Sequence, residues 1–128
     1  MLDTTILIAA ERTSLAIGDL IADADDVAIA AITAAELLVG VELADDRHKS
    51  ARRAFVDSLL VLIPVEPYDL PTARVHAELL AHARTTGRRR GAHDLLIAAT
   101  ARAHARTVVT ADVAGFDGLP GVVIRPRP

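Results

Sequence analysis

The sequence predicts an α/β domain with a parallel sheet, and three observations support this prediction. Short apolar segments typical of buried strands alternate with helical patterns along the chain. From Leu95 to Ala99 no side chain is polar, so the helix expected there is buried. The β-branched run at residues 107–110 follows this helix directly, which makes half of a βαβ unit. The length of 128 residues fits one domain, and we expect it to span residues 1–128.

Two strands and three helices are predicted in the first half of the chain, at residues 1–10, 14–22, 27–32, 33–41 and 45–62. The first is an apolar segment that we interpret as a strand running into a turn or a helix, and Asp3 interrupts it. The helix from residue 33 opens with Thr33 and Glu36 in the pattern of a capping box, which satisfies two free backbone N–H groups. The last helix is amphipathic, and its charges form a solvated face.

Three strands and two helices are predicted in the second half, at residues 62–65, 71–85, 94–105, 107–110 and 122–124. Pro64 limits the first of these strands to an edge or a strand end. The long helix ends in Thr86-Gly87, and its two histidines lack the spacing of a metal-binding pair. The last apolar strand follows a loop rich in glycine and proline.

Composition restricts the kinds of site that the chain can build. There is no cysteine, so disulfides and thiolate metal sites are excluded, and any metal must use oxygen or imidazole ligands. No apolar run approaches the roughly 18 residues of a membrane span and no signal peptide is visible, so we expect a soluble, cytoplasmic protein without a membrane partner. The net charge of −3 gives no overall basic field, and three aromatic residues argue against a stacking platform for bases.

Four acidic residues lie where the predicted strands end or where a helix begins. Asp3 interrupts the first strand, Glu36 falls in the capping box, Asp94 lies in the first turn of the apolar helix, and Asp112 follows the last β-branched run. Taken singly, each has a structural explanation, and for Asp94 the helix dipole provides it. Taken together, they share one rim of a parallel sheet, where ligands bind. Several carboxylates on one rim repel one another, and a hard divalent cation such as Mg²⁺ relieves this repulsion.

Four short motifs are spread over nearly the whole chain: LDTT at 2–5, ITAAEL at 32–37 with Gly40, DLLIAATA at 94–101, and VTAD at 109–112 followed by Phe116. In these motifs and in their order, the chain resembles PIN-domain proteins and, among them, the VapC toxins of bacterial toxin–antitoxin pairs. The DLLIAATA segment with the upstream LDT and AEL is quite specific. The resemblance implies a three-layer α/β/α fold, a PIN-like parallel sheet between helices.

The same resemblance implies Mg²⁺- or Mn²⁺-dependent cleavage of RNA at a site whose catalytic residues and metal ligands are Asp3, Glu36, Asp94 and Asp112. Hydroxyl support is expected from Thr4, Thr5 and Thr110. The ions would bind the scissile phosphate, lower the pKa of a bound water and stabilise the charge that develops on the phosphate. Such toxins are typically homodimers that a small VapB-type antitoxin neutralises with its tail in the acidic cleft.

The fourth acid and the basic loop leave alternatives open. The family's last motif varies in which residue carries the acid, so Asp117 is the alternative to Asp112, which we prefer because it directly follows the strand. The consecutive arginines Arg88, Arg89 and Arg90 precede Asp94 closely, and they either guide the RNA backbone toward the cleft or form a solvated turn.

Three further classes of protein are alternatives to a ribonuclease, and the sequence disfavours the last two. A catalytically silent metal-binding or RNA-binding module of the same fold would keep the acids without turnover. A phospho-acceptor receiver domain wants paired acids after its first strand and a lysine near the carboxyl end, whereas here Asp3 stands alone and the only lysine is Lys49. A phosphoaspartyl phosphatase requires an acid where this chain has Thr5.

Homodimerisation is also expected, because 52% of the residues are hydrophobic, which is more than one small sheet can cover.

Overall fold

The computed structural model describes residues 1–13, 18 and 26–127. The predicted helix at residues 14–22 lies outside the described residues except for position 18. In chain order the described elements are α1 (Thr4–Arg12), β1 (Ile29–Ala30), α3 (Ala31–Glu42), α4 (Lys49–Leu62), β2 (Val65–Glu66), α5 (Leu70–Thr86), α6 (Ala92–Ala103), β3 (Val108–Thr110), the 3₁₀ turn η1 (Val113–Gly115) and β4 (Ile124–Pro126). None of the helices in these ranges is both long and apolar enough to cross a membrane.

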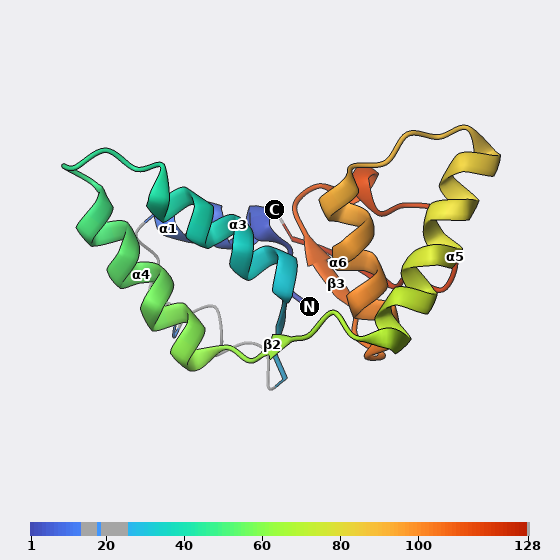
Figure 1. Ribbon diagram of the computed structural model, residues 1–128, viewed down its shortest axis with the longest axis horizontal. Helices are drawn as coiled ribbons and strands as arrows, with labels where there is room; N and C mark the ends of the chain where they lie inside the picture. The colour runs from blue at the N-terminus through green and yellow to red at the C-terminus, as the bar shows by residue number, and fades with distance from the viewer. Residues whose placement is uncertain (14–17, 19–25, 128) are drawn as a thin grey trace.

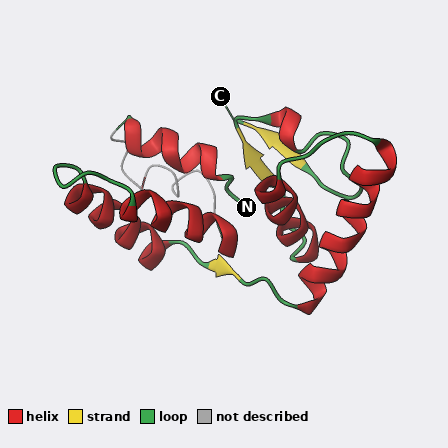
Figure 2. Ribbon diagram, turned by 45° about the horizontal axis from the view of Figure 1, so that its top comes forward, coloured by secondary structure: helices red, strands yellow, loops and turns green. Residues whose placement is uncertain are grey.

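The strands are short and parallel, as the sequence predicts. β1 pairs with β2, and β3 pairs with β4. Leu2 joins the two pairs, because it forms a parallel bridge with Val109 on one side and donates its N–H to the Ala28 carbonyl at 2.9 Å on the other. The spatial order is therefore β4, β3, the segment at residues 1–3, β1 and β2. Figure 2 shows the helices on both sides of these strands.

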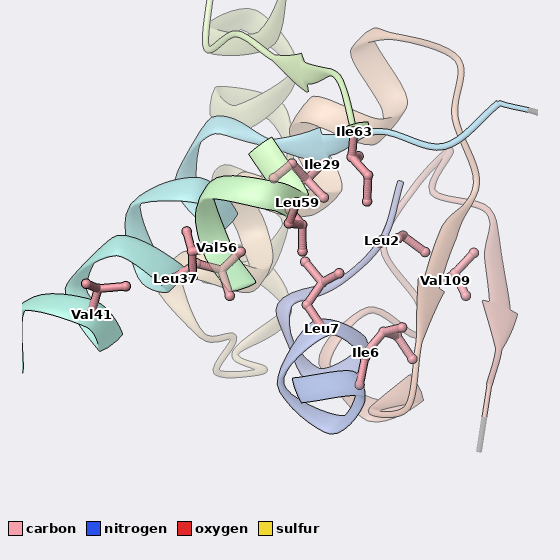
Figure 3. Close-up of a cluster of buried hydrophobic side chains, with 11 residues drawn as sticks. Leu2, Ile6, Leu7, Ile29, Leu37, Val41, Val56, Leu59, Ile63 and Val109 are labelled. Atoms are coloured by element: carbon pink, nitrogen blue, oxygen red, sulfur yellow. The ribbon is translucent and has the colours of Figure 1, made fainter. Parts of the chain in front are cut away.

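Two core clusters lie on opposite faces of the strands and produce the three layers. Successive side chains of a strand point to opposite faces. One cluster contains Leu2, Ile29 and Val109 from the strands together with side chains of α1, α3 and α4 (Figure 3). The other cluster contains Met1, Ala30 and Val108, each of which is next in the chain to one of those three strand residues. Side chains of α5 and α6 complete it. In Figure 1 these two groups of helices accordingly lie on either side of the strands and of both marked chain ends.

The first strand is much shorter than predicted. Only Leu2 forms a strand bridge, and α1 begins at Thr4. Ile6, Leu7 and Ala10 are buried, and this spacing places them on one face of a helix. The expected turn into a helix is thus present, but it comes directly after Asp3, and Asp3 therefore lies at the boundary between strand and helix.

The predicted capping box at Thr33 and Glu36 is wrong. α3 begins at Ala31, immediately after β1, so both residues lie inside the helix. Ala30 is the N-cap, and its extended backbone turns the chain from strand to helix without a side-chain cap. Thr33 is fully buried instead of capping a helix end. Glu36 is consequently free of the structural role that the sequence pattern suggests.

Element boundaries in the rest of the chain differ from the prediction by a few residues. α4 begins at Lys49 because Asp45 accepts the His48 N–H at 2.9 Å in a preceding turn. β2 and β4 begin two to three residues later than predicted, since their extent is set by parallel pairing with β1 and β3. The long helix α5 matches its prediction closely and ends at Gly87, whose φ of 68° is left-handed.

Candidate functional site

Asp3 is a buried acid held by two hydroxyl groups. Its backbone N–H donates to the Val109 carbonyl at 2.9 Å, which fixes it at the end of the strand segment. Its side chain is 2% exposed, and Oδ2 accepts from Thr5 Oγ1 at 2.8 Å and from Thr110 Oγ1 at 2.7 Å. The Thr110 hydroxyl also accepts the backbone N–H of Asp112 at 2.9 Å. Hydrogen bonds to an ionised group offset the cost of burying it, so these threonines keep Asp3 in place.

Glu36 projects from α3 toward the start of α1 and toward α6. Thr4 Oγ1 donates to Glu36 Oε1 at 3.0 Å and lies 3.2 Å from the Thr33 hydroxyl. The ring nitrogen Nδ1 of His93, on the first turn of α6, lies 3.4 Å from Glu36 Oε2. Glu36, on α3, therefore connects α1 through Thr4 and α6 through His93. Asp94 lies on the same helix α6.

Asp94 is the third residue of α6, where the first free N–H groups of the helix favour a negative charge. Burial nevertheless raises the pKa of Asp94 above its usual range, and the negative charges of Asp3, Asp112 and Glu36 raise this pKa further. Protonated His93 has the opposite, smaller effect on the pKa. The ionised form of Asp94 is thus disfavoured by burial and by the other three acids.

Two glycines lie directly against the Asp94 carboxylate. A Cβ atom built on Gly91 would lie 3.1 Å from Asp94 Oδ2, and one built on Gly115 would lie only 2.7 Å from it. The Gly115 Cβ would also lie 3.4 Å from Asp112 Oδ2. A contact of 2.7 Å forces something to move, so any other residue at position 115 would fill the space beside these two carboxylates. The turn η1 can approach the acids because its backbone is bare there.

The donor set suits a hard divalent cation. All four acids offer carboxylate oxygens, the ligands that Mg²⁺ and Mn²⁺ prefer. The space that a Cβ on Gly115 would occupy lies next to two of these acids. Within residues 1–13, 18 and 26–127, no three Asp, Glu or His side chains are placed so that they could hold a metal ion together. Mg²⁺ usually keeps several waters and binds through one or two carboxylates, so an open acidic rim fits it.

The three arginines predicted to contact RNA divide into two groups. Arg88 donates to the carbonyls of Ala114 and Asp117 at 3.1 and 3.2 Å, and Arg90 donates to the same two carbonyls. Both therefore hold the turn that carries Gly115. Arg89 is exposed and forms no such bond with a described residue. The charge of Asp117, the alternative fourth acid, acts on the Arg90 guanidinium, and Asp117 is not among the acids that shift the pKa of Asp94.

Sequence reasoning missed Gly91, Gly115 and His93. His93 had a weak signal, since it directly precedes Asp94 in the chain. Gly115 belongs to a loop that is rich in glycine and proline, and nothing in that pattern separates a turn glycine from one that contacts a carboxylate. Only the distances to Asp94 and Asp112 identify its role.

The sequence matches one protein family over most of its length. The PIN domain family model matches residues 1–120. Toxin FitB of Neisseria gonorrhoeae is 36% identical over 106 residues, which cover 80% of this chain and 76% of that protein. Ribonuclease VapC5 of Mycobacterium tuberculosis is 36% identical over 126 residues, which cover 97% and 92%.

Solved structures agree with these sequence matches. The structure of VapBC-5 from Mycobacterium tuberculosis, a member of the VapBC family of toxin–antitoxin systems, has a TM-score of 0.79 at 35% identity, covering 98% of this chain and 96% of the other. VapBC2 from Rickettsia felis, bound to a DNA fragment from its promoter, has a TM-score of 0.89 at 26% identity, covering 100% and 98%. The chain therefore belongs to the PIN domain family.

Proposed function

We propose that this protein is a metal-dependent endoribonuclease that acts as the toxin of a VapBC-type toxin–antitoxin pair. Its relatives are named as VapC ribonucleases, and its structural neighbours are VapBC complexes. The observation that carries the proposal is the position of Asp94, whose carboxylate lies with that of Asp112 beside the bare backbone of Gly115. Burial and the charges of Asp3, Asp112 and Glu36 oppose the ionised form of Asp94. A cation bound beside these acids would offset that cost.

The four acids would hold Mg²⁺ or Mn²⁺, which lowers the pKa of a bound water and neutralises charge on the scissile phosphate. Thr5 and Thr110 orient Asp3, because both hydroxyls donate to its Oδ2. Thr4 orients Glu36 in the same manner. Arg88 and Arg90 hold the turn beside Asp94 in place.

An antitoxin is the partner that the solved neighbours suggest for this chain. A groove of about 240 Å³ begins at Thr4 and Glu36 and continues between α1, α3 and α4. Arg12 and Arg52 lie along it. A segment of the antitoxin that followed this groove would reach the acidic rim and block it.

A homodimer is the proposed state of the free protein. Leu43 and Val61, at the ends of α3 and α4, are 82% and 84% exposed. Contact with a second copy would remove such apolar surface from water. Sedimentation at micromolar concentration is the test, and a clean monomer without antitoxin would exclude the dimer.

The decisive experiment for the enzyme measures cleavage of a labelled single-stranded RNA with Mn²⁺, with Mg²⁺ and with a chelator. We expect cleavage by the unmodified protein only when a metal is present, and loss of cleavage in Asp94→Asn. The matched control is Asp57→Asn, because Asp57 lies on the exposed face of α4, away from the site. A protein that binds metal and RNA but never cleaves would be the catalytically silent module instead.

A further inference from the structure

A second cavity lies on the other side of the α6 N-terminus from the acids. Its volume is about 270 Å³, and it lies between the last turns of α5 and the loop that leads to α6. Leu80, Ala83 and Leu95 form its apolar floor. Its remaining lining is Gly87 and a run of arginines, and no carboxylate of a described residue takes part. An apolar floor beneath a cationic rim suits a ligand with a flat apolar part and a negative part.

The arginines of this rim have separate tasks. Arg88 and Arg90 already donate to the Ala114 and Asp117 carbonyls, so they fasten the rim to the turn beside the acids. The other two, Arg84 and Arg89, are exposed and form no hydrogen bond or ion pair with any residue in the described ranges. Their guanidinium groups therefore remain available for an anion, and the planar fork of arginine matches phosphate.

The cavity is adjacent to the acidic site along two paths. Leu95 in the cavity floor follows Asp94 in α6, so one residue of the helix faces the acids and the next faces the cavity. Arg90 lines the cavity and also contacts the turn that carries Gly115. A polyanion that reaches the acids with one phosphate could therefore place a neighbouring unit in the cavity.

We propose that this cavity, named here the α5–α6 pocket (Leu80, Ala83, Arg84, Gly87, Arg89 and Leu95), binds one unpaired nucleotide of the RNA substrate next to the cleaved phosphate. The proposal rests on the ribonuclease function proposed above. The base lies on the apolar floor, and its phosphate lies between Arg84 and Arg89. Sequence-specific RNA recognition targets single strands whose unstacked bases can be splayed out, and an apolar floor gives such a base a surface on which it is removed from water.

Charge explains why such a site is needed. The acidic rim repels RNA until metal is bound, and the chain as a whole carries a net charge of −3. Attraction for the phosphate backbone of the RNA must then come from a local basic surface. The arginines of the α5–α6 pocket supply such a surface beside the acids. A free phosphate ion would leave the floor of Leu80, Ala83 and Leu95 unused, so the pocket favours a nucleotide.

The first test measures RNA binding without cleavage. The full protein is titrated, in a metal chelator, into a labelled single-stranded RNA of ten nucleotides at several salt concentrations. The double variant Arg84→Gln, Arg89→Gln is compared with Arg47→Gln, Arg53→Gln, which removes the same charge from the α4 side of the molecule. We expect the salt slope to fall by about 0.7 in the pocket variant, the value for one lost phosphate contact on a single strand, and to stay unchanged in the control. Equal slopes for both variants would overturn the proposal.

A second test locates the ligand. Amide resonances of Ala83, Gly87 and Leu95 are followed by NMR during titration with adenosine 5′-monophosphate, ribose 5-phosphate and inorganic phosphate. We expect the nucleotide to shift Ala83 and Leu95, and the two ligands without a base to shift neither. Identical shifts with inorganic phosphate would mean a simple anion site, and shifts with a polyglutamate peptide but not with the nucleotide would mean a protein partner. Either result overturns the proposal.

These readouts remain separate from the enzyme assay. If the protein binds nucleotide in the pocket but cleaves no RNA with Mn²⁺, the proposed ribonuclease activity fails while the pocket stands. If cleavage occurs and the pocket variants bind and titrate as the unmodified protein does, the pocket fails while the activity stands.

Discussion

Asp3 and Asp94 lie on the same rim, yet their surroundings differ in kind. Asp3 is 2% exposed and accepts hydroxyl protons from Thr5 and Thr110. Asp94 faces the bare backbone of glycines, and burial and neighbouring acids raise its pKa. The first carboxylate has its charge stabilised by the protein itself. The second has room beside it and a charge that the protein does not neutralise, and this combination is what a bound cation can use.

The difference separates positioning from binding within one site. Threonine hydroxyls fix where an acid points, and they do so without adding charge. A glycine has no side chain that could orient an acid, but it leaves a space next to the carboxylate that any other residue's side chain would fill. We expect substitutions on the threonine side to act mainly on the stability of the fold, and substitutions on the glycine side to act mainly on metal affinity. Four experiments examine this comparison.

The largest effect is expected from the metal itself. Mn²⁺ at 100 times its Kd should raise the free energy of unfolding of the unmodified protein by about 2.7 kcal/mol. At the same metal concentration Asp94→Asn should gain much less, because it removes a ligand and part of the repulsion that the metal relieves. Thermal unfolding with and without Mn²⁺ measures both gains. Equal gains for the two proteins would place the metal elsewhere.

Thr110→Val should lower the free energy of unfolding by about 2 kcal/mol, because it removes a hydrogen bond to the buried Asp3 carboxylate and one from the Asp112 N–H. The shape of the side chain is preserved, so the loss is due to the hydroxyl. Thr107→Val is the control, since the Thr107 hydroxyl bonds to no described residue and the change should stay within about 0.5 kcal/mol. Urea denaturation measures both, and equal losses would refute a specific role for Thr110.

Gly115→Ala should weaken Mn²⁺ binding by about tenfold, the size of effect typical when the surroundings that orient a metal ligand are changed. The new methyl group would press on Asp94 Oδ2, which lies 2.7 Å from its position. Gly40→Ala is the control, because its Cβ would meet only the Arg52 side chain at 3.9 Å, and it should stabilise α3 by about 0.5–1 kcal/mol. Isothermal titration of metal that showed no difference between the two variants would contradict the role of Gly115.

The smallest effect concerns pH in the absence of metal. The folded protein binds the Asp94 proton more tightly than the unfolded chain does, so ionisation of Asp94 costs stability as pH rises. Asp94→Asn should therefore match the unmodified protein below the ordinary carboxyl pKa of about 3.9 and exceed it in stability at neutral pH. The difference in free energy of unfolding between the two proteins should grow as pH rises from that value to the raised pKa of Asp94. A gap that did not change with pH would show that Asp94 is not perturbed.

The alternation of apolar strands and helices was enough to predict the parallel α/β layers, because burial on both faces of a sheet leaves a clear pattern. Local pattern failed at Glu36. The capping box that it suggested involves neighbours in sequence, whereas Glu36 accepts its hydrogen bond from Thr4, 32 positions away. A long-range contact of this kind leaves no local trace.

The role of Gly115 was equally invisible, since it depends on how closely η1 approaches α6. Strand ends were misplaced for a related reason. β2 and β4 extend only as far as their partners β1 and β3 allow. The resemblance to PIN-domain proteins named the acids and the three threonines as a set, but which hydroxyl contacts which acid depends on how the fold brings distant segments together.

The bond between Thr110 and Asp3 joins residues 107 positions apart, and this separation has a consequence for synthesis on the ribosome. Asp3 leaves the ribosome early, but neither the Val109 carbonyl nor the Thr110 hydroxyl that hold it exist until most of the chain has been translated. Contacts of such range form late in folding. We expect an unfinished chain to have no assembled acidic site until translation is nearly complete.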